Sequence, residues 1–176
     1  FNLNQQTMEN EISTGQYAKK WGLIYGVITL ALALIPLLLE IQSQWLGLLN
    51  IVIAIVAYVM ATKEFKSDNG GNMTFGEGFR ICITAALIAG VLRSVVSYVY
   101  IKFIDPEVMQ RMAQAMQDAW RQQGMTEEQI EQAQRFSAGF TNPEIGLVVG
   151  IIVVLLGGLI WGSIVSAIIK NDAEEF

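Results

Sequence analysis

The sequence predicts an all-α membrane protein with four transmembrane helices and an extracytoplasmic amphipathic αα-hairpin between the third and fourth spans. Of the 176 residues, 53% are hydrophobic and only 15% are charged, whereas soluble domains carry roughly 25% charged residues. Four apolar runs approach or exceed the ~20 residues that cross a bilayer. The polar stretch between the last two runs has helical periodicity.

The expected spans cover residues 21–39, 45–62, 81–101 and 145–169, so that residues 21–176 form one membrane domain. Residues 1–20 are a polar segment without the pattern of a signal peptide. Met8 begins a stretch that resembles a natural start, so residues 1–7 are expected to be an extension or the result of a start assigned too far upstream. The short first connection predicts that spans one and two are antiparallel neighbours, and Pro36 is expected to bend span one.

Lysine and arginine residues predict the orientation, because they concentrate in cytoplasmic loops. Outside the spans, six basic residues lie at the N-terminal flank, in the second connection (63–80) and in the tail, four lie in the third connection, and none lies in the first. Both termini are therefore expected in the cytoplasm. The six on the expected cytoplasmic side are Lys19, Lys20, Lys63, Lys66, Arg80 and Lys170. The four in the third connection are Lys102, Arg111, Arg121 and Arg135.

Capping signals delimit the helices between the spans. Thr74 with Glu77 forms a capping box ahead of span three. Asp105–Pro106 predicts the start of a first hairpin helix that ends near Gly124. The capping box Thr126–Gln129 predicts the start of the second hairpin helix. Asn142 with Pro143 predicts the cap of span four.

The predicted hairpin, residues 105–140, carries an apolar stripe at three- and four-residue spacing. A hairpin of this size buries little apolar surface alone, so the stripe is expected to contact another surface. That surface is the other arm of the hairpin, the bilayer surface or a partner protein. Four basic against seven acidic residues in the third connection disfavour adsorption to anionic lipid. The candidate partner surface consists of Met109, Met112, Met116 and Trp120.

Arg93 lies inside span three, where an arginine costs about 2.5–3.5 kcal/mol on insertion scales. We expect it to join Asn50 and Glu40 in a polar cluster in the outer half of the bundle. One interpretation is structural, a buried or snorkelling cation that fixes helix register. The other is a binding site for an anionic lipid headgroup or a polyprenyl phosphate, with neighbouring donors from Ser94, Ser97 and Tyr98.

Small residues at four-residue spacing predict close helix packing. The packing is either within the four spans or between copies in a homo-oligomer. The glycines concerned are Gly22, Gly26, Gly90, Gly146, Gly150, Gly158 and Gly162.

The composition argues against several classes of function. The chain has no histidine, which excludes histidine-based catalytic dyads and histidine-ligated metal or haem. The single cysteine, Cys82, is expected to be structural. A net charge of −5 argues against nucleic acid as a partner, and no phosphate-binding glycine motif is present. We therefore expect no enzyme, no cofactor and no metal site.

Three strings carry a family resemblance: DNGGNMTFGEGF at 68–79, YVYIKFIDPEVM at 98–109 and GMTEEQIEQAQ at 124–134. With the four spans and the short charged tail, they resemble the bacterial membrane-protein family called domain of unknown function 4199. The resemblance implies an inner-membrane protein without an established activity. It also implies a candidate partner, a polyprenyl-phosphate glycosyltransferase encoded nearby, and it supplies no catalytic residues.

We expect a non-enzymatic accessory, scaffold or assembly subunit of a membrane complex. Its hairpin and glycine faces would contact another membrane protein or a second copy. The alternative is a binder or transport element for an anionic lipid or polyprenyl-phosphate-linked substrate that uses Arg93.

Overall fold

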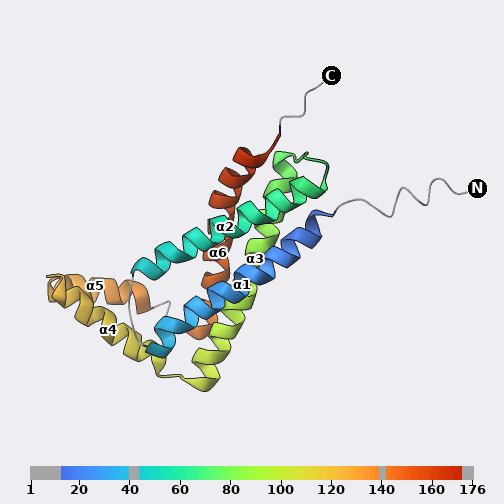
Figure 1. Ribbon diagram of the computed structural model, residues 1–176. Helices are drawn as coiled ribbons and strands as arrows, with labels where there is room; N and C mark the ends of the chain where they lie inside the picture. Colours follow the sequence, from blue (N-terminus) through green and yellow to red (C-terminus); the bar gives the residue numbers. More distant parts are fainter. Residues whose placement is uncertain (1–12, 40–43, 139–141, 172–176) are drawn as a thin grey trace, which may run out of the picture.

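The computed structural model describes residues 13–39, 44–138 and 142–171, and throughout these ranges the regular structure is helical (Figure 1). Four of the helices are long and apolar enough to cross a membrane, and two short ones lie between the third and fourth of these. This confirms the predicted all-α class, with four candidate spans and a helical hairpin between the third and fourth, whereas the extracytoplasmic side of the hairpin stays a prediction. The helices are α1 (Thr14–Leu39), α2 (Gln44–Asp68), α3 (Phe75–Val99), α4 (Val108–Gln122), α5 (Glu127–Ala138) and α6 (Pro143–Ile169), with a π-helical turn η1 at Tyr100–Ile104.

Helix α3 is the central element, because it packs extensively on α1 and on α6 and also contacts α2. Figure 1 shows α1 and α2 in front of α3 and α6, with both ends of the described chain at one end of the bundle. We call this the terminal end. The opposite end, from which α4 and α5 project sideways, is the hairpin end.

Small side chains explain why α3 takes the central position. Its buried residues are nearly all small, so neighbouring backbones approach closely on two sides, which is how membrane helices gain packing energy without a hydrophobic driving force. Tyr25 of α1 and Tyr58 of α2 fill the adjoining space edge to face, with ring centroids 5.8 Å apart. The buried residues of α3 are Gly78, Ile81, Cys82, Ala85, Ala86, Ala89, Gly90 and Ser94.

The predicted helix starts are confirmed at three places. Thr74 and Glu77 form the capping box of α3, with the Thr74 backbone N–H donating to the Glu77 carboxylate at 2.7 Å. Thr126 begins α5 with a reciprocal bond to Gln129. Asn142 caps α6 by accepting from the backbone N–H groups of residues 144 and 145.

The hairpin begins later than predicted. Asp105 follows the unexpected π-helical turn, and α4 starts at Val108 rather than directly after Asp105–Pro106. Gly124, with a φ of 82°, ends α4 as predicted, because its backbone adopts a left-handed conformation that other residues rarely take. The hairpin thus has the expected form with a displaced first turn.

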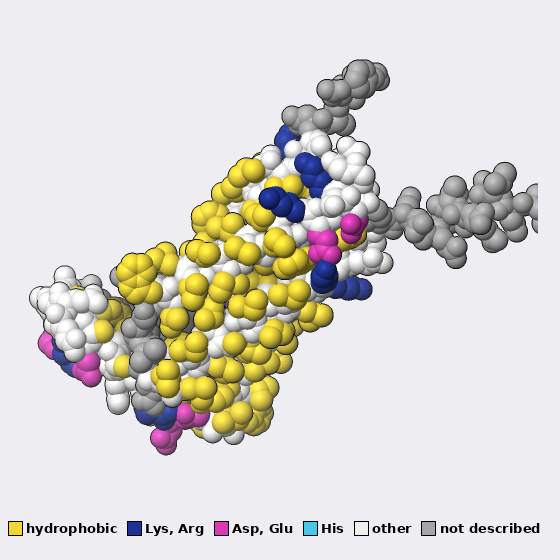
Figure 2. Space-filling view, viewed as in Figure 1, with side chains coloured by type: hydrophobic (Ala, Val, Ile, Leu, Met, Phe, Trp, Pro, Cys, Tyr) yellow, Lys and Arg dark blue, Asp and Glu magenta, His cyan; other side chains and the backbone are white. Residues whose placement is uncertain are grey.

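The spanning helices also extend beyond the predicted spans at the terminal end. Helix α1 begins at Thr14 and runs through Pro36, and α2 continues to Asp68. Polar contacts between the extensions explain the difference: Tyr17 donates to Asp68 at 2.7 Å, and Lys20 and Trp21 both donate to Glu64. Figure 2 shows an apolar belt between these charged residues and those of the hairpin end.

Candidate functional site

A pocket of about 330 Å³ lies between α3 and α6 in the hairpin-end half of the bundle. It extends from Arg93 to Ile101 along α3 and η1, about 12 Å of helix. Helix α6 supplies the facing wall, and Met109 of α4 lies at the outer end. Its size is within the usual range for small-ligand sites. The lining residues are Arg93, Ser94, Ser97, Tyr98, Ile101, Met109, Asn142, Pro143, Gly146, Leu147, Val149, Gly150 and Val153.

Arg93 supplies the only formal charge among these lining residues. Its side chain is half-buried, and no hydrogen bond or ion pair joins its guanidinium to another residue in the described parts of the chain. The hydroxyl groups of Ser94, Ser97 and Tyr98 lie on the same wall. The pocket is therefore an apolar recess with one cation and several neutral donors.

The charged groups at the outer end of the pocket neutralise one another. Lys102 pairs with Glu144 and donates to the Tyr98 hydroxyl at 2.7 Å. Asp105 accepts from both terminal nitrogens of Arg111, the closer contact being 2.5 Å. Arg111, followed by the backbone N–H groups of residues 107 and 108, holds the pKa of Asp105 below its ordinary value. None of these carboxylates compensates Arg93 directly.

The first turn of α6 adds a further positive field. Asn142 and Pro143 line the pocket where this long helix begins. A helix N-terminus carries about half a positive charge from its aligned peptide dipoles. Because this field and Arg93 act on the same recess, the pocket favours an anion.

The predicted cluster of Arg93, Asn50 and Glu40 is not assembled by hydrogen bonds in the described residues. The Asn50 amide nitrogen donates to the Leu46 carbonyl of its own helix at 2.8 Å, and its oxygen is buried without a hydrogen-bond partner. Glu40 lies outside the described residues. Arg93 instead faces the pocket between α3 and α6.

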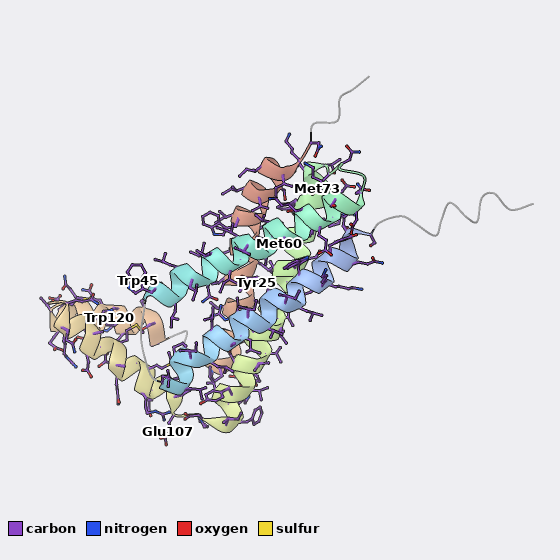
Figure 3. The ribbon with its side chains drawn as sticks, viewed as in Figure 1. Tyr25, Trp45, Met60, Met73, Glu107 and Trp120 are labelled. Atoms are coloured by element: carbon purple, nitrogen blue, oxygen red, sulfur yellow. The ribbon has the colours of Figure 1, made fainter. Side chains whose placement is uncertain are left out.

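The candidate partner surface on α4 is half-buried along its length. Met112, Met116 and Trp120 are neither fully buried nor strongly exposed, on the helix that pairs with α5 (Figure 3). Met109 lines the pocket. The stripe therefore contributes to hairpin packing and to the pocket, and its use by a partner stays a prediction.

Most of the predicted packing glycines lie where helices approach closely. A Cβ atom at Gly22 or Gly26 would meet backbone atoms of α3 at 3.0–3.1 Å. On α6, a Cβ at Gly150, Gly158 or Gly162 would lie 2.6–2.7 Å from a side-chain atom of α3. At Gly90 it would meet Val154 at 3.2 Å. Gly146 lines the pocket.

Sequence reasoning missed the outer end of the site. Lys102 and Glu144 are 42 residues apart, and neither carries a local signal for the other. Asn142 was identified as a cap, yet its place in the pocket depends on how α6 packs on α3. Arg93 and the hydroxyl residues Ser94, Ser97 and Tyr98 could be grouped from the sequence, because all four lie on one helix.

Comparison with known proteins assigns the chain to a family. No curated protein and no solved structure matches the chain significantly. A family model described as protein of unknown function (DUF4199) matches residues 20–171, which include all four spanning helices except the first residues of α1. The chain therefore belongs to the DUF4199 family.

Proposed function

We propose that this DUF4199 protein is a non-enzymatic binding or transport element for an anionic amphiphile, whose phosphate group it holds at Arg93. The observation that carries the proposal is the unpaired Arg93 guanidinium in an otherwise uncharged pocket. A guanidinium presents a planar fork of donors that matches phosphate oxygens. A bound phosphate would therefore compensate the charge that the described residues leave unbalanced.

The pocket walls favour an amphiphile over free phosphate. Leu147, Val149 and Val153 line the apolar side, and α6 continues toward the bilayer centre with exposed side chains such as Leu156. A hydrocarbon chain on this surface would remain in contact with lipid while its head lies in the pocket. Phospholipids and polyprenyl phosphates share this chemistry.

The test is native mass spectrometry of the chain, purified in a mild detergent, with three added probes. These are phosphatidylglycerol, undecaprenyl phosphate and phosphatidylcholine. We expect at least one of the two anionic probes to bind more tightly than phosphatidylcholine, which has no net charge. Arg93→Gln should weaken that binding about 10- to 100-fold, since hydrogen bonds to charged groups contribute roughly 1.5–3 kcal/mol.

Arg80→Gln is the matched control, because Arg80 lies on the same helix at the terminal end and is exposed. It should leave binding unchanged, and Arg93→Lys should retain part of it through a point charge. Equal binding by Arg93→Gln and the unaltered chain, with both folded by circular dichroism, would refute the proposal. The stronger anionic probe identifies the ligand source.

A second candidate function is that of an accessory subunit. Helices α4 and α5 pack mainly on each other, and Figure 1 shows them projecting from the bundle. Such an arm is suited to contact a neighbouring membrane protein, including the glycosyltransferase implied by the resemblance. A stoichiometric protein retained on the chain, and lost when Trp120 is changed to serine, would support this function.

The proposed location is the bacterial inner membrane with both termini in the cytoplasm. The membrane is the one that the family resemblance implies. The orientation is supported by the distribution of basic residues, six of which flank the spans at the terminal end. Cysteine labelling at Gln123 and Asn69, at opposite ends of the bundle, by an impermeant reagent distinguishes the two orientations. Only the variant with cysteine at position 123 should react from outside.

A further inference from the structure

A second hollow, of about 580 Å³, lies at the terminal end between α2 and α6. It is far from Arg93, which faces the hairpin-end half of the bundle. Basic and hydroxyl side chains from α2 lie opposite isoleucines from α6. The lining residues are Lys63, Lys66, Ser67, Gly71, Ile168 and Ile169.

The acidic side chains of α2 point away from this hollow. Glu64 accepts hydrogen bonds from Lys20 and Trp21 of α1 at 2.5 and 2.6 Å. Asp68 accepts from Tyr17, also of α1. No carboxylate is among the described residues that line the hollow. The end of α2 thus has an acidic face toward α1 and a basic face toward α6.

The walls of the hollow are held by hydrogen bonds. Lys66 donates to the backbone carbonyl of Ile169 at 2.8 Å, which fixes the end of α6 to α2. Asn171 donates from its backbone to Met73 and from its side chain to Gly71, both at 3.0 Å. These bonds within the chain hold the walls in place, and a rigid wall lowers the entropic cost of binding.

The ammonium group of Lys63 is free to bind a ligand at this hollow. It is exposed, and no ion pair or hydrogen bond links it to another part of the described chain. Ser67 lies four residues later on α2, on the same face of the helix. Their ammonium and hydroxyl groups can both donate to one anion at the mouth of the hollow.

An apolar track leads from the hollow toward the middle of the bundle. Ile168 is 76% exposed and Ile164 is 44% exposed on α6. Met60 of α2, labelled in Figure 3, is 45% exposed. Met60 precedes Lys63 on α2, and Ile164 precedes Ile168 on α6, so these two side chains lie on the bilayer side of the hollow. An acyl chain can follow them.

We propose that this hollow binds the phosphate headgroup of an anionic phospholipid, with Lys63 and Ser67 at the phosphate and an acyl chain along Met60 and Ile164. The site is separate from the proposed Arg93 site and does not depend on it. The basic residues at this end predict that the lipid belongs to the cytoplasmic leaflet. Lys66 contributes charge while it holds the wall.

The experiment titrates the purified full chain with phosphatidylglycerol and phosphatidylcholine of the same acyl chains, by native mass spectrometry. All measurements use an Arg93→Gln background, so that failure of the Arg93 proposal does not affect the result. Lys63→Gln should raise the apparent Kd for phosphatidylglycerol about fivefold, the factor for about 1 kcal/mol per lysine at an anionic headgroup. Phosphatidylcholine binding should not change.

Lys19→Gln is the matched control, since Lys19 is an exposed lysine of the same end on α1. If Lys19→Gln weakens phosphatidylglycerol binding as much as Lys63→Gln does, the proposed site is wrong and the lipid is attracted non-specifically by the basic residues of this end. Equal binding of the two lipids would also overturn it. The tail at 172–176 contains three acidic residues. If phosphatidylglycerol binds only after residues 172–176 are removed, the proposal is wrong and the tail itself is the occupant.

Discussion

Adding one methyl group to the interface between α3 and α6 tests the packing of the bundle. A Cβ at Gly158 would lie 2.6 Å from the Cβ of Ala86, and one at Gly162 would lie 2.7 Å from the Cβ of Cys82. Gly157 is the control on the same helix, because a Cβ there meets nothing within 4 Å. We compare Gly158→Ala and Gly162→Ala with Gly157→Ala.

The expected cost follows from these distances. Carbon atoms in contact are separated by about 3.5–4.0 Å, so each substitution requires the helices to separate by about 1 Å. Neither obstructing atom can rotate away, since a Cβ is fixed to its backbone. Overpacking of this kind costs about 1–3 kcal/mol. Gly157→Ala should leave the free energy of unfolding unchanged or slightly raised, because alanine favours a helix.

The assay is reversible unfolding in mixed micelles of dodecyl maltoside and SDS, followed by circular dichroism. The free energy of unfolding should fall in the two interface variants and not in the control. If Gly158→Ala unfolds at the same SDS fraction as Gly157→Ala, the close approach of α3 and α6 is refuted. If all three variants lose stability equally, the effect comes from α6 alone and not from the interface.

Three further outcomes are expected. Thr74→Ala should destabilise α3 by about 1 kcal/mol through loss of its capping box, measured in the same SDS titration. Glu64→Ala should lower stability more than Glu64→Gln, because the amide oxygen can still accept from Trp21. Arg111 lowers the pKa of Asp105 from 3.8, so their pair stabilises the start of α4 fully above that pH and loses its effect as the pH falls through the lowered pKa. The protection factors of the amides in the first turn of α4, which correct for the intrinsic change of the exchange rate with pH, should decrease over that acidic range, and Asp105→Asn should remove this decrease.

Local signals account for the parts of the fold that the sequence predicts well. Span length and hydropathy identify α1, α2, α3 and α6. Each of these helices must be apolar and long enough to cross the bilayer, whatever it packs against. The caps at Thr74 and Asn142 involve residues only two or three positions apart. Gly124 ends α4 through its own backbone conformation.

Contacts between distant helices account for what was missed. The helix extensions at the terminal end depend on Glu64 meeting Lys20, 44 residues away. The predicted cluster was inferred from similar depths of Arg93 and Asn50 in the membrane. Depth alone does not say which neighbour a side chain faces: Arg93 lines the pocket between α3 and α6, and the Asn50 amide nitrogen donates within α2. Glu40, the third member, lies outside the described residues.

Helix α6 connects the packing of the bundle with both proposed sites. It is the most apolar of the four spanning helices and also the least buried, and the residues that it does bury are mostly small. Gly150 lies against Ser94 in the wall of the Arg93 pocket, whereas Ile168 and Ile169 border the hollow at the other end. A ligand in either site contacts α6 together with a second helix. Because binding to the folded state alone adds to its stability, occupancy of these sites would reinforce the attachment that the glycine contacts begin.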